Sequence, residues 1–99
     1  MKIIPRRKNV LGAFWEKFPD SEQQLKAWHA EAKNADWRKP HDVKDRYVSA
    51  SILKGSRVVF NIRGNKYRLV VKINYQLQII YIRFLGTHKE YDRIDAETI

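Results

Sequence analysis

Four side chains in the second half of the chain could together break a phosphodiester bond in RNA: Arg68, Arg83, His88 and Tyr91. A metal-free reaction uses the 2′-hydroxyl of the RNA as nucleophile. The protein must align that hydroxyl, accept its proton, stabilise charge on phosphorus and protonate the leaving 5′-oxygen. Guanidinium groups match phosphate oxygens, so the two arginines could stabilise the charge. Histidine transfers protons near neutral pH, and Tyr91 could stack on a base or act as an acid or base.

A second set of basic and amide side chains could hold the RNA chain: Asn61, Arg63, Lys66, Lys72 and Lys89. Each catalytic candidate also has a purely structural interpretation. The arginines could bind phosphate without catalysis or solvate an exposed sheet face. His88 could hydrogen-bond the backbone at a helix start, and Tyr91 could pack beneath the sheet edge. Residue types alone therefore indicate only a basic, nucleic-acid-binding domain.

The chain is strongly basic, and its excess charge lies in one block. Its 99 residues include 20 Lys+Arg against 11 Asp+Glu, which gives a formal net charge of +9. No Asp or Glu occurs between Arg46 and Lys89, and the remaining residues are neutral in sum. Because a solvated surface usually mixes both signs of charge, this block predicts an electropositive face for a polyanion.

Composition excludes several other chemistries. The chain has no cysteine, which rules out a disulfide framework, thiolate metal sites and a cysteine nucleophile. The basic block lacks the paired carboxylates of a two-metal nuclease, and the three histidines are far apart in sequence, so we expect no metal and no cofactor. No apolar run approaches the about 20 residues of a membrane span, and no signal-peptide pattern is present, so we expect a cytoplasmic protein.

The first half of the chain is predicted to be helical after a short extended opening. Apolar residues recur every four positions from Val10 to Phe18, and Pro19 ends this helix. Asp20, followed three residues later by Gln23, resembles a capping box and opens a second helix. The short connection predicts an antiparallel helical hairpin, and one further helical turn is expected near residues 43–47.

The second half alternates with period two and predicts three antiparallel strands, covering residues 57–63, 67–75 and 79–84. A turn at Gly64-Asn65 places Phe60 opposite Leu69. The second turn places Val71 opposite Ile82 and Leu69 opposite Phe84, so that both hairpins keep apolar residues on one face. The prediction is an α+β fold, with an N-terminal helical hairpin packed on a small antiparallel meander, in one domain of residues 1–99.

This register also predicts how the catalytic candidates meet. Val70 lies opposite Arg83, so Arg68 and Arg83 become diagonal neighbours about 7–8 Å apart. His88 and Tyr91 are three residues apart and would share one face of a short helix that begins after Thr87.

Two motifs resemble the central hairpin and the closing motif of HigB-type toxins in the RelE/ParE superfamily. They are Val59–Val70 (VFNIRGNKYRLV) and Thr87–Asp92 (THKEYD), and the similarity extends over nearly the whole chain. The resemblance implies a RelE-like fold and the toxin of a bacterial type II toxin–antitoxin pair. It also implies a metal-independent endoribonuclease that cleaves mRNA on the ribosome. The implied partner is a HigA-type antitoxin with a helix-turn-helix domain, and operator DNA is contacted only through that antitoxin.

The family's catalytic residues are basic strand residues and an aromatic residue or histidine near the end of the chain. By position these are Arg68, Arg83, His88 and Tyr91, with Lys72 and Asp92 as secondary candidates. Two other functions stay open, because a fold alone does not define an activity. A ParE-like toxin would bind and inhibit a DNA topoisomerase, and a non-catalytic module would only bind RNA.

Overall fold

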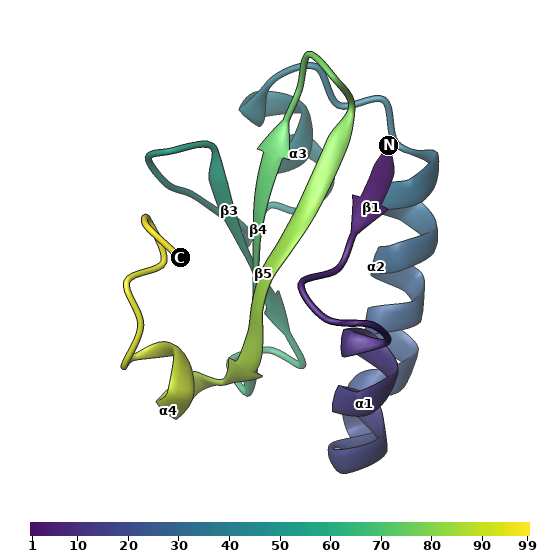
Figure 1. The fold of residues 1–99 in the computed structure, drawn as a ribbon, viewed down its shortest axis with the longest axis vertical. Coiled ribbons are helices and arrows are strands. Elements are labelled where there is room, and N and C mark those ends of the chain that lie inside the picture. The colour runs from purple at the N-terminus through teal and green to yellow at the C-terminus, as the bar shows by residue number, and fades with distance from the viewer.

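A five-stranded sheet with the strand order β1-β5-β4-β3-β2 organises the structure. The computed structural model describes residues 1–99 (Figure 1). The strands are β1 (Lys2–Ile4), β2 (Ser51–Ile52), β3 (Arg57–Ile62), β4 (Tyr67–Asn74) and β5 (Ile79–Thr87). β1 runs parallel to β5, and the other pairs are antiparallel. The predicted α+β class is confirmed, and the sheet is wider than predicted because β1 and β2 extend it at both edges.

The helices of the first half of the chain cover one face of this sheet, and the last part of the chain covers the other (Figure 1). The first group comprises α1 (Val10–Lys17), the 3-10 turn η1 (Pro19–Ser21), α2 (Glu22–Asn34) and α3 (Pro40–Arg46), whereas the last part of the chain begins with α4 (His88–Tyr91). Helix α1 ends just before Pro19, as predicted, because proline has no amide hydrogen to continue the helix. None of the helices is both long and apolar enough to cross a bilayer.

The predicted capping box at Asp20 is wrong. Ser21 is the N-cap of α2 and makes no side-chain cap hydrogen bond. The Asp20 carboxylate instead accepts hydrogen bonds from Tyr67 Oη (2.6 Å) and Lys66 Nζ (2.8 Å). The ammonium group of Lys66, in the turn before β4, and the phenol of Tyr67 therefore replace the local amide that a cap would have used. The connection between α1 and α2 is consequently tied to the start of β4.

The core between the helices and the sheet is built around Phe60 of β3. Its ring lies 5.5 Å from the Trp28 ring, 5.1 Å from the Tyr47 ring and 6.4 Å from the Trp37 ring, measured between centroids. Phe60 and Trp28 are almost completely buried. The aromatic cluster thus joins α2, the α3 region and the middle of the sheet.

A β-bulge in β5 changes the predicted register. The pairs Phe60–Leu69 and Val71–Ile82 are confirmed. Leu69, however, pairs with Leu85 rather than with Phe84, because the register shifts between Val70 and Val71. The bulge adds one residue, so Phe84 moves to the second face of the sheet and Leu85 takes its place in the core. Because apolar side chains lie on both faces of this part of the sheet, the alternation of apolar and polar residues could not specify the register.

The second face of the sheet consists of two polar rows separated by an apolar row. In strand order β3-β4-β5, the register gives the rows Arg57–Lys72–Tyr81, Val59–Val70–Phe84 and Asn61–Arg68–Gly86. We call residues Asp92–Ile99 the covering segment. Its apolar residues Ile94, Ala96 and Ile99 pack on the apolar row, at the left of Figure 1. The predicted open basic face is therefore divided in two by a small second core.

Candidate functional site

Arg68 of β4 is the most enclosed cation of the basic block. Its residue is 9% exposed, and its Nη1 donates to the main-chain oxygen of Tyr67 (3.3 Å). Its Nη2 donates to Oδ1 of Asn65 (3.0 Å), and the guanidinium lies 5.7 Å from the centroid of the Tyr91 ring. All these partners are neutral, and Arg68 takes part in none of the ion pairs. Its charge is thus available to an anionic ligand.

Tyr91 reaches Arg68 because α4 is held firmly at its first residue. The Thr87 hydroxyl accepts from the Glu90 amide (3.2 Å), and the Glu90 carboxylate accepts from the Thr87 amide (2.9 Å). This capping box lowers the pKa of Glu90, chiefly through the Thr87 backbone hydrogen bond. Thr87 is thus confirmed as the helix start. The Tyr91 ring contacts both Arg68 and the Phe84 ring, whose centroid is 6.4 Å away.

His88 lies on the same short helix but has a different partner. Its Nδ1 is 3.2 Å from Oδ2 of Asp92, and its side chain is 48% exposed. Asp92, a secondary candidate in the sequence, therefore belongs beside His88. The Asp92 carboxylate lies beside Nδ1, so Nε2 is the ring nitrogen that is free to contact a substrate.

Arg83 is separated from Arg68 by the bulge. The predicted diagonal contact required Val70 to lie opposite Arg83, whereas Val70 pairs with Phe84. Arg83 is the extra residue of the bulge, and its Nε donates to the main-chain oxygen of Ile99 (3.3 Å). The structure thus brings Arg68 together with Tyr91, and it places Arg83 against the covering segment.

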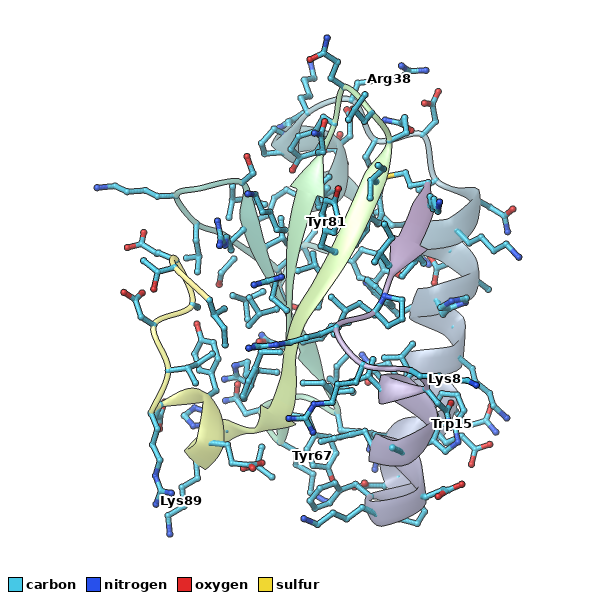
Figure 2. The ribbon with its side chains drawn as sticks, viewed as in Figure 1. Lys8, Trp15, Arg38, Tyr67, Tyr81 and Lys89 are labelled. Atoms are coloured by element: carbon cyan, nitrogen blue, oxygen red, sulfur yellow. The ribbon has the colours of Figure 1, made fainter.

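The five predicted RNA-binding residues differ in their partners. Arg63 and Lys66, at the turn between β3 and β4, surround Asp20, with Nε and Nζ 4.0 and 2.8 Å from its Oδ2. Asn61 donates through Nδ2 to the main-chain oxygen of Ser49 (3.3 Å). Lys72 and Lys89 are exposed and form no ion pair. Figure 2 shows Lys89 extending from the end of the molecule where α4 lies.

Two further residues of this face were not among the sequence candidates. Asn65 was predicted only as a turn residue, yet its carbonyl oxygen orients Arg68. Arg57 belongs to the basic block and contacts the same Ile99 oxygen as Arg83. The only feature of the sequence that pointed to Arg57 was its place in the basic block, the stretch without Asp or Glu between Arg46 and Lys89. The partner of Asn65 depends on the hairpin geometry.

The Asp20 cluster makes a prediction about stability in acid. The Lys66 and Tyr67 hydrogen bonds hold the pKa of Asp20 below its ordinary value. The stabilisation is therefore present above the unfolded pKa of about 3.9, and it is lost as the pH falls through the folded value. We expect Asp20→Asn to lower Tm at pH 7, with a difference from the wild type that shrinks below about pH 4.

Circular dichroism melts between pH 7 and pH 3 measure this difference. Asp36→Asn is the control, because Asp36 is 71% exposed and pairs only with the exposed Arg38. A constant Tm difference between the Asp20 variant and the wild type across this range would contradict the assignment.

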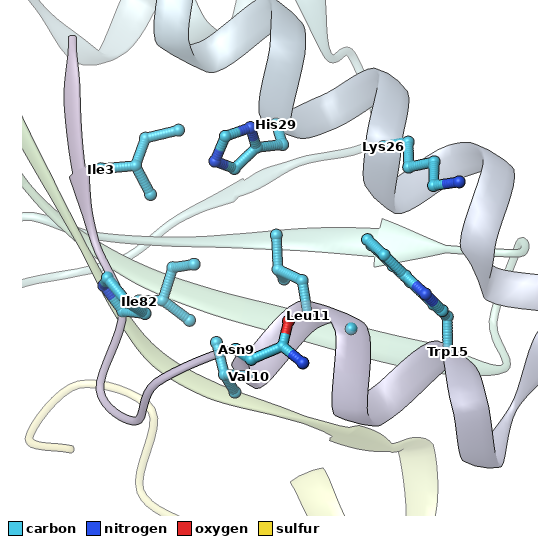
Figure 3. A pocket seen from close by; sticks show the side chains of 10 residues that line it. Ile3, Asn9, Val10, Leu11, Trp15, Lys26, His29 and Ile82 are labelled. Atoms are coloured by element: carbon cyan, nitrogen blue, oxygen red, sulfur yellow. The ribbon is translucent and has the colours of Figure 1, made fainter.

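An apolar pocket of about 290 Å³ lies on the helix side, away from these residues (Figure 3). Ile3, Leu11, Trp15 and Ile82 line its apolar wall, and Lys26 and His29 are among its polar residues. It contains no predicted site residue. No group of three or more histidine or carboxylate side chains is arranged to hold a metal ion.

The fold and the site define a small α+β protein that presents uncompensated arginine charge to an anionic ligand. The chain belongs to the HigB toxin family, the RelE-like toxic component of a toxin–antitoxin system, which matches residues 21–94. The mRNA interferase toxin HigB of Escherichia coli (strain K12) is 34% identical over 83 residues, covering 82% of this chain and 80% of that protein. The mRNA interferase HigB proteins of Escherichia coli O157:H7 and Shigella flexneri match equally well. The predicted resemblance is confirmed, and the ParE-like alternative is not favoured.

Proposed function

We propose that residues 1–99 form a single toxin domain that inhibits translation by cleaving mRNA. The observation that carries the proposal is the buried guanidinium of Arg68, which lies beside Tyr91 and has no carboxylate partner. Family membership supports the same activity, because three relatives are named as mRNA interferases. An uncompensated arginine beside an aromatic ring suits RNA, which offers a phosphate and a base to stack.

The reaction we propose needs only the RNA and side chains of this face. The 2′-oxygen attacks phosphorus and forms a new P–O bond, while Nε2 of His88 accepts the hydroxyl proton. Arg68 donates hydrogen bonds to the phosphoryl oxygens, where negative charge accumulates. The bond to the 5′-oxygen breaks, its electron pair stays on that oxygen, and His88 returns to it the proton taken from the 2′-hydroxyl, which leaves the imidazole neutral again. The products are a 2′,3′-cyclic phosphate and a 5′-hydroxyl. Tyr91 stacks on a base, and Lys72 and Lys89 hold neighbouring phosphates.

We also propose the setting in which the toxin acts. Members of its family are the toxic component of a toxin–antitoxin system, so the partner of this chain is an antitoxin. We propose a HigA-type antitoxin with a helix-turn-helix domain, which alone contacts operator DNA. The mRNA is cleaved while it is bound to the ribosome in the cytoplasm. A net charge of +9 favours association with ribosomal RNA through phosphates.

A cleavage assay with purified protein tests the proposed function. A reporter mRNA is incubated with the toxin, with and without translating ribosomes, and the ends of the fragments are analysed. We expect ribosome-dependent cleavage that leaves 2′,3′-cyclic phosphates and 5′-hydroxyl ends. Fragments with 3′-hydroxyl ends would refute the 2′-hydroxyl reaction. RNA binding without cleavage would identify a non-catalytic module, and topoisomerase inhibition without cleavage would identify a ParE-like toxin.

A further inference from the structure

A groove between α2 and β3 begins at the side chain that orients Arg68. Its outer part is a pocket of about 350 Å³ lined only by polar residues and glycine, namely Gln24, Ser49, Asn61, Gly64 and Asn65. Its inner part is a pocket of about 170 Å³ that shares Gln24, Ser49 and Asn61 with the outer one. Asn65 joins the groove to the candidate site, because its Oδ1 accepts a hydrogen bond from Nη2 of Arg68 (3.0 Å).

Two carboxamides of the outer pocket are each oriented through one half of the amide. Nδ2 of Asn61 donates to the main-chain oxygen of Ser49 (3.3 Å), and its Oδ1 makes no hydrogen bond within the protein. Asn65 has the opposite arrangement, since its Oδ1 accepts from Arg68 and its Nδ2 makes no hydrogen bond. The outer pocket therefore offers an oriented acceptor and an oriented donor to a ligand.

The inner pocket has a buried donor without a partner in its wall. Trp28 of α2 lines this pocket and is 1% exposed, and its indole Nε1 makes no hydrogen bond within the protein. Tyr47 and Phe60 provide further aromatic side chains of the wall. Because buried donors are nearly always paired, an acceptor supplied by a ligand accounts for the indole N–H.

The groove differs from Arg68 in charge. Glu31 is the only charged residue that lines it, and its carboxylate forms an ion pair with Arg46. Arg68, in contrast, has no carboxylate partner. A ligand that spans both therefore combines an anionic group with a neutral group that carries donors and acceptors on its edge. One nucleotide of RNA has this composition, with its phosphate at Arg68 and its base in the groove.

We propose that the groove binds the base of a nucleotide that flanks the cleaved bond, and that Asn61 and Trp28 determine which base is accepted. The proposal rests on the proposed function and deepens it. The free amide atoms of Asn61 and Asn65 bind the polar edge of the base, and an acceptor on the base receives the N–H of Trp28. Tyr91 then stacks on the other flanking base.

Cleavage of synthetic mRNA on ribosomes tests this proposal, with the base on each side of the cleaved bond varied in turn. We expect the wild type to prefer one base at one of the two positions. Trp28→Phe keeps an aromatic ring but removes the N–H, so kcat/KM for the preferred base should fall about tenfold, the usual effect of one buried hydrogen bond. Asn61→Ala should lower the same preference, because it removes the acceptor of the outer pocket.

Two control variants separate recognition of a base from packing. Trp37→Phe shortens another buried indole that contacts Phe60, but Trp37 does not line the groove, so the base preference should be retained. Asn34→Ala is the control for Asn61→Ala, because Nδ2 of Asn34 donates to a main-chain oxygen within α2, outside the groove. Circular dichroism confirms that each variant is folded.

An mRNA that lacks the base at the preferred position tests the occupant of the groove. The wild type should cleave it as slowly as mRNA with a disfavoured base, and Trp28→Phe and Asn61→Ala should cause no further loss, because both changes remove the same contact. Cleavage without preference at both positions, a variant that behaves like its control, or a further loss on the abasic mRNA would refute base binding in the groove while the cleavage activity stands. A wild type that does not cleave mRNA would refute the proposed function itself.

Discussion

Replacing Arg68 with alanine is expected to lower the rate of mRNA cleavage by a factor of about 100–1,000, the usual loss when one donor to a transition-state oxyanion is removed. Arg68 is already oriented before RNA binds, because Asn65, the Tyr67 main-chain oxygen and the Tyr91 ring hold its guanidinium. Little rearrangement is then needed when charge develops on phosphorus. Growth inhibition by the expressed toxin should be lost to the same extent.

Two comparisons separate this catalytic role from a role in folding or in general charge. Arg68→Lys keeps the charge but removes the planar fork, so it should restore binding of RNA more than it restores turnover. Arg38→Ala removes the same side chain from an exposed ion pair and should leave the cleavage rate unchanged. Single-turnover cleavage and circular dichroism provide the readouts. A folded Arg68→Ala variant with wild-type turnover would show that the reaction takes place elsewhere.

The second large effect is expected in the core. Phe60→Ala should destabilise the protein by about 3–5 kcal/mol, which is typical of a buried aromatic residue replaced by alanine. Phe60 is 2% exposed and contacts three aromatic rings, those of Trp28, Trp37 and Tyr47. A domain of this size has a total stability of about 5–15 kcal/mol, so much of it would be lost.

Urea unfolding followed by tryptophan fluorescence measures this cost as a shift of the midpoint. Val48→Ala is the control, because Val48 is 77% exposed and its truncation should leave the midpoint nearly unchanged. Phe60→Val, which retains part of the volume, should fall between the two. Equal midpoints for Phe60→Ala and Val48→Ala would show that the aromatic cluster does not hold the helices to the sheet.

The sequence predicted those features that local patterns control. Pro19 ends α1 because its ring forbids helix continuation, and Thr87 begins α4 because a hydroxyl and Glu90 satisfy free amides. The tight turn at Gly64 fixed the register of β3 and β4. In each case the decisive partners are at most a few residues apart or follow directly from the turn.

Features that depend on distant partners were not predicted. Asp20 has the spacing of a cap, but it binds Lys66 and Tyr67, which lie more than forty positions away. The bulge at Arg83 is favoured by packing of Phe84 on the second face, and alternation does not reveal that packing. Arg57 meets Arg83 only through the covering segment, so no spacing in the sequence links them. Long-range contacts thus account for most of the differences at the site.

The two edge strands have a consequence for behaviour at high protein concentration. β1 has three residues and β2 has two, and they flank the much longer β5 and β3. A long unpaired strand exposes a row of amide and carbonyl groups that recruits further strands from other molecules. Here β1 and β2 pair with part of the outer sides of β5 and β3, and the two edge strands are themselves too short to act as good templates. A toxin released from its antitoxin thus carries built-in resistance to edge-to-edge aggregation, and its net positive charge adds to that resistance.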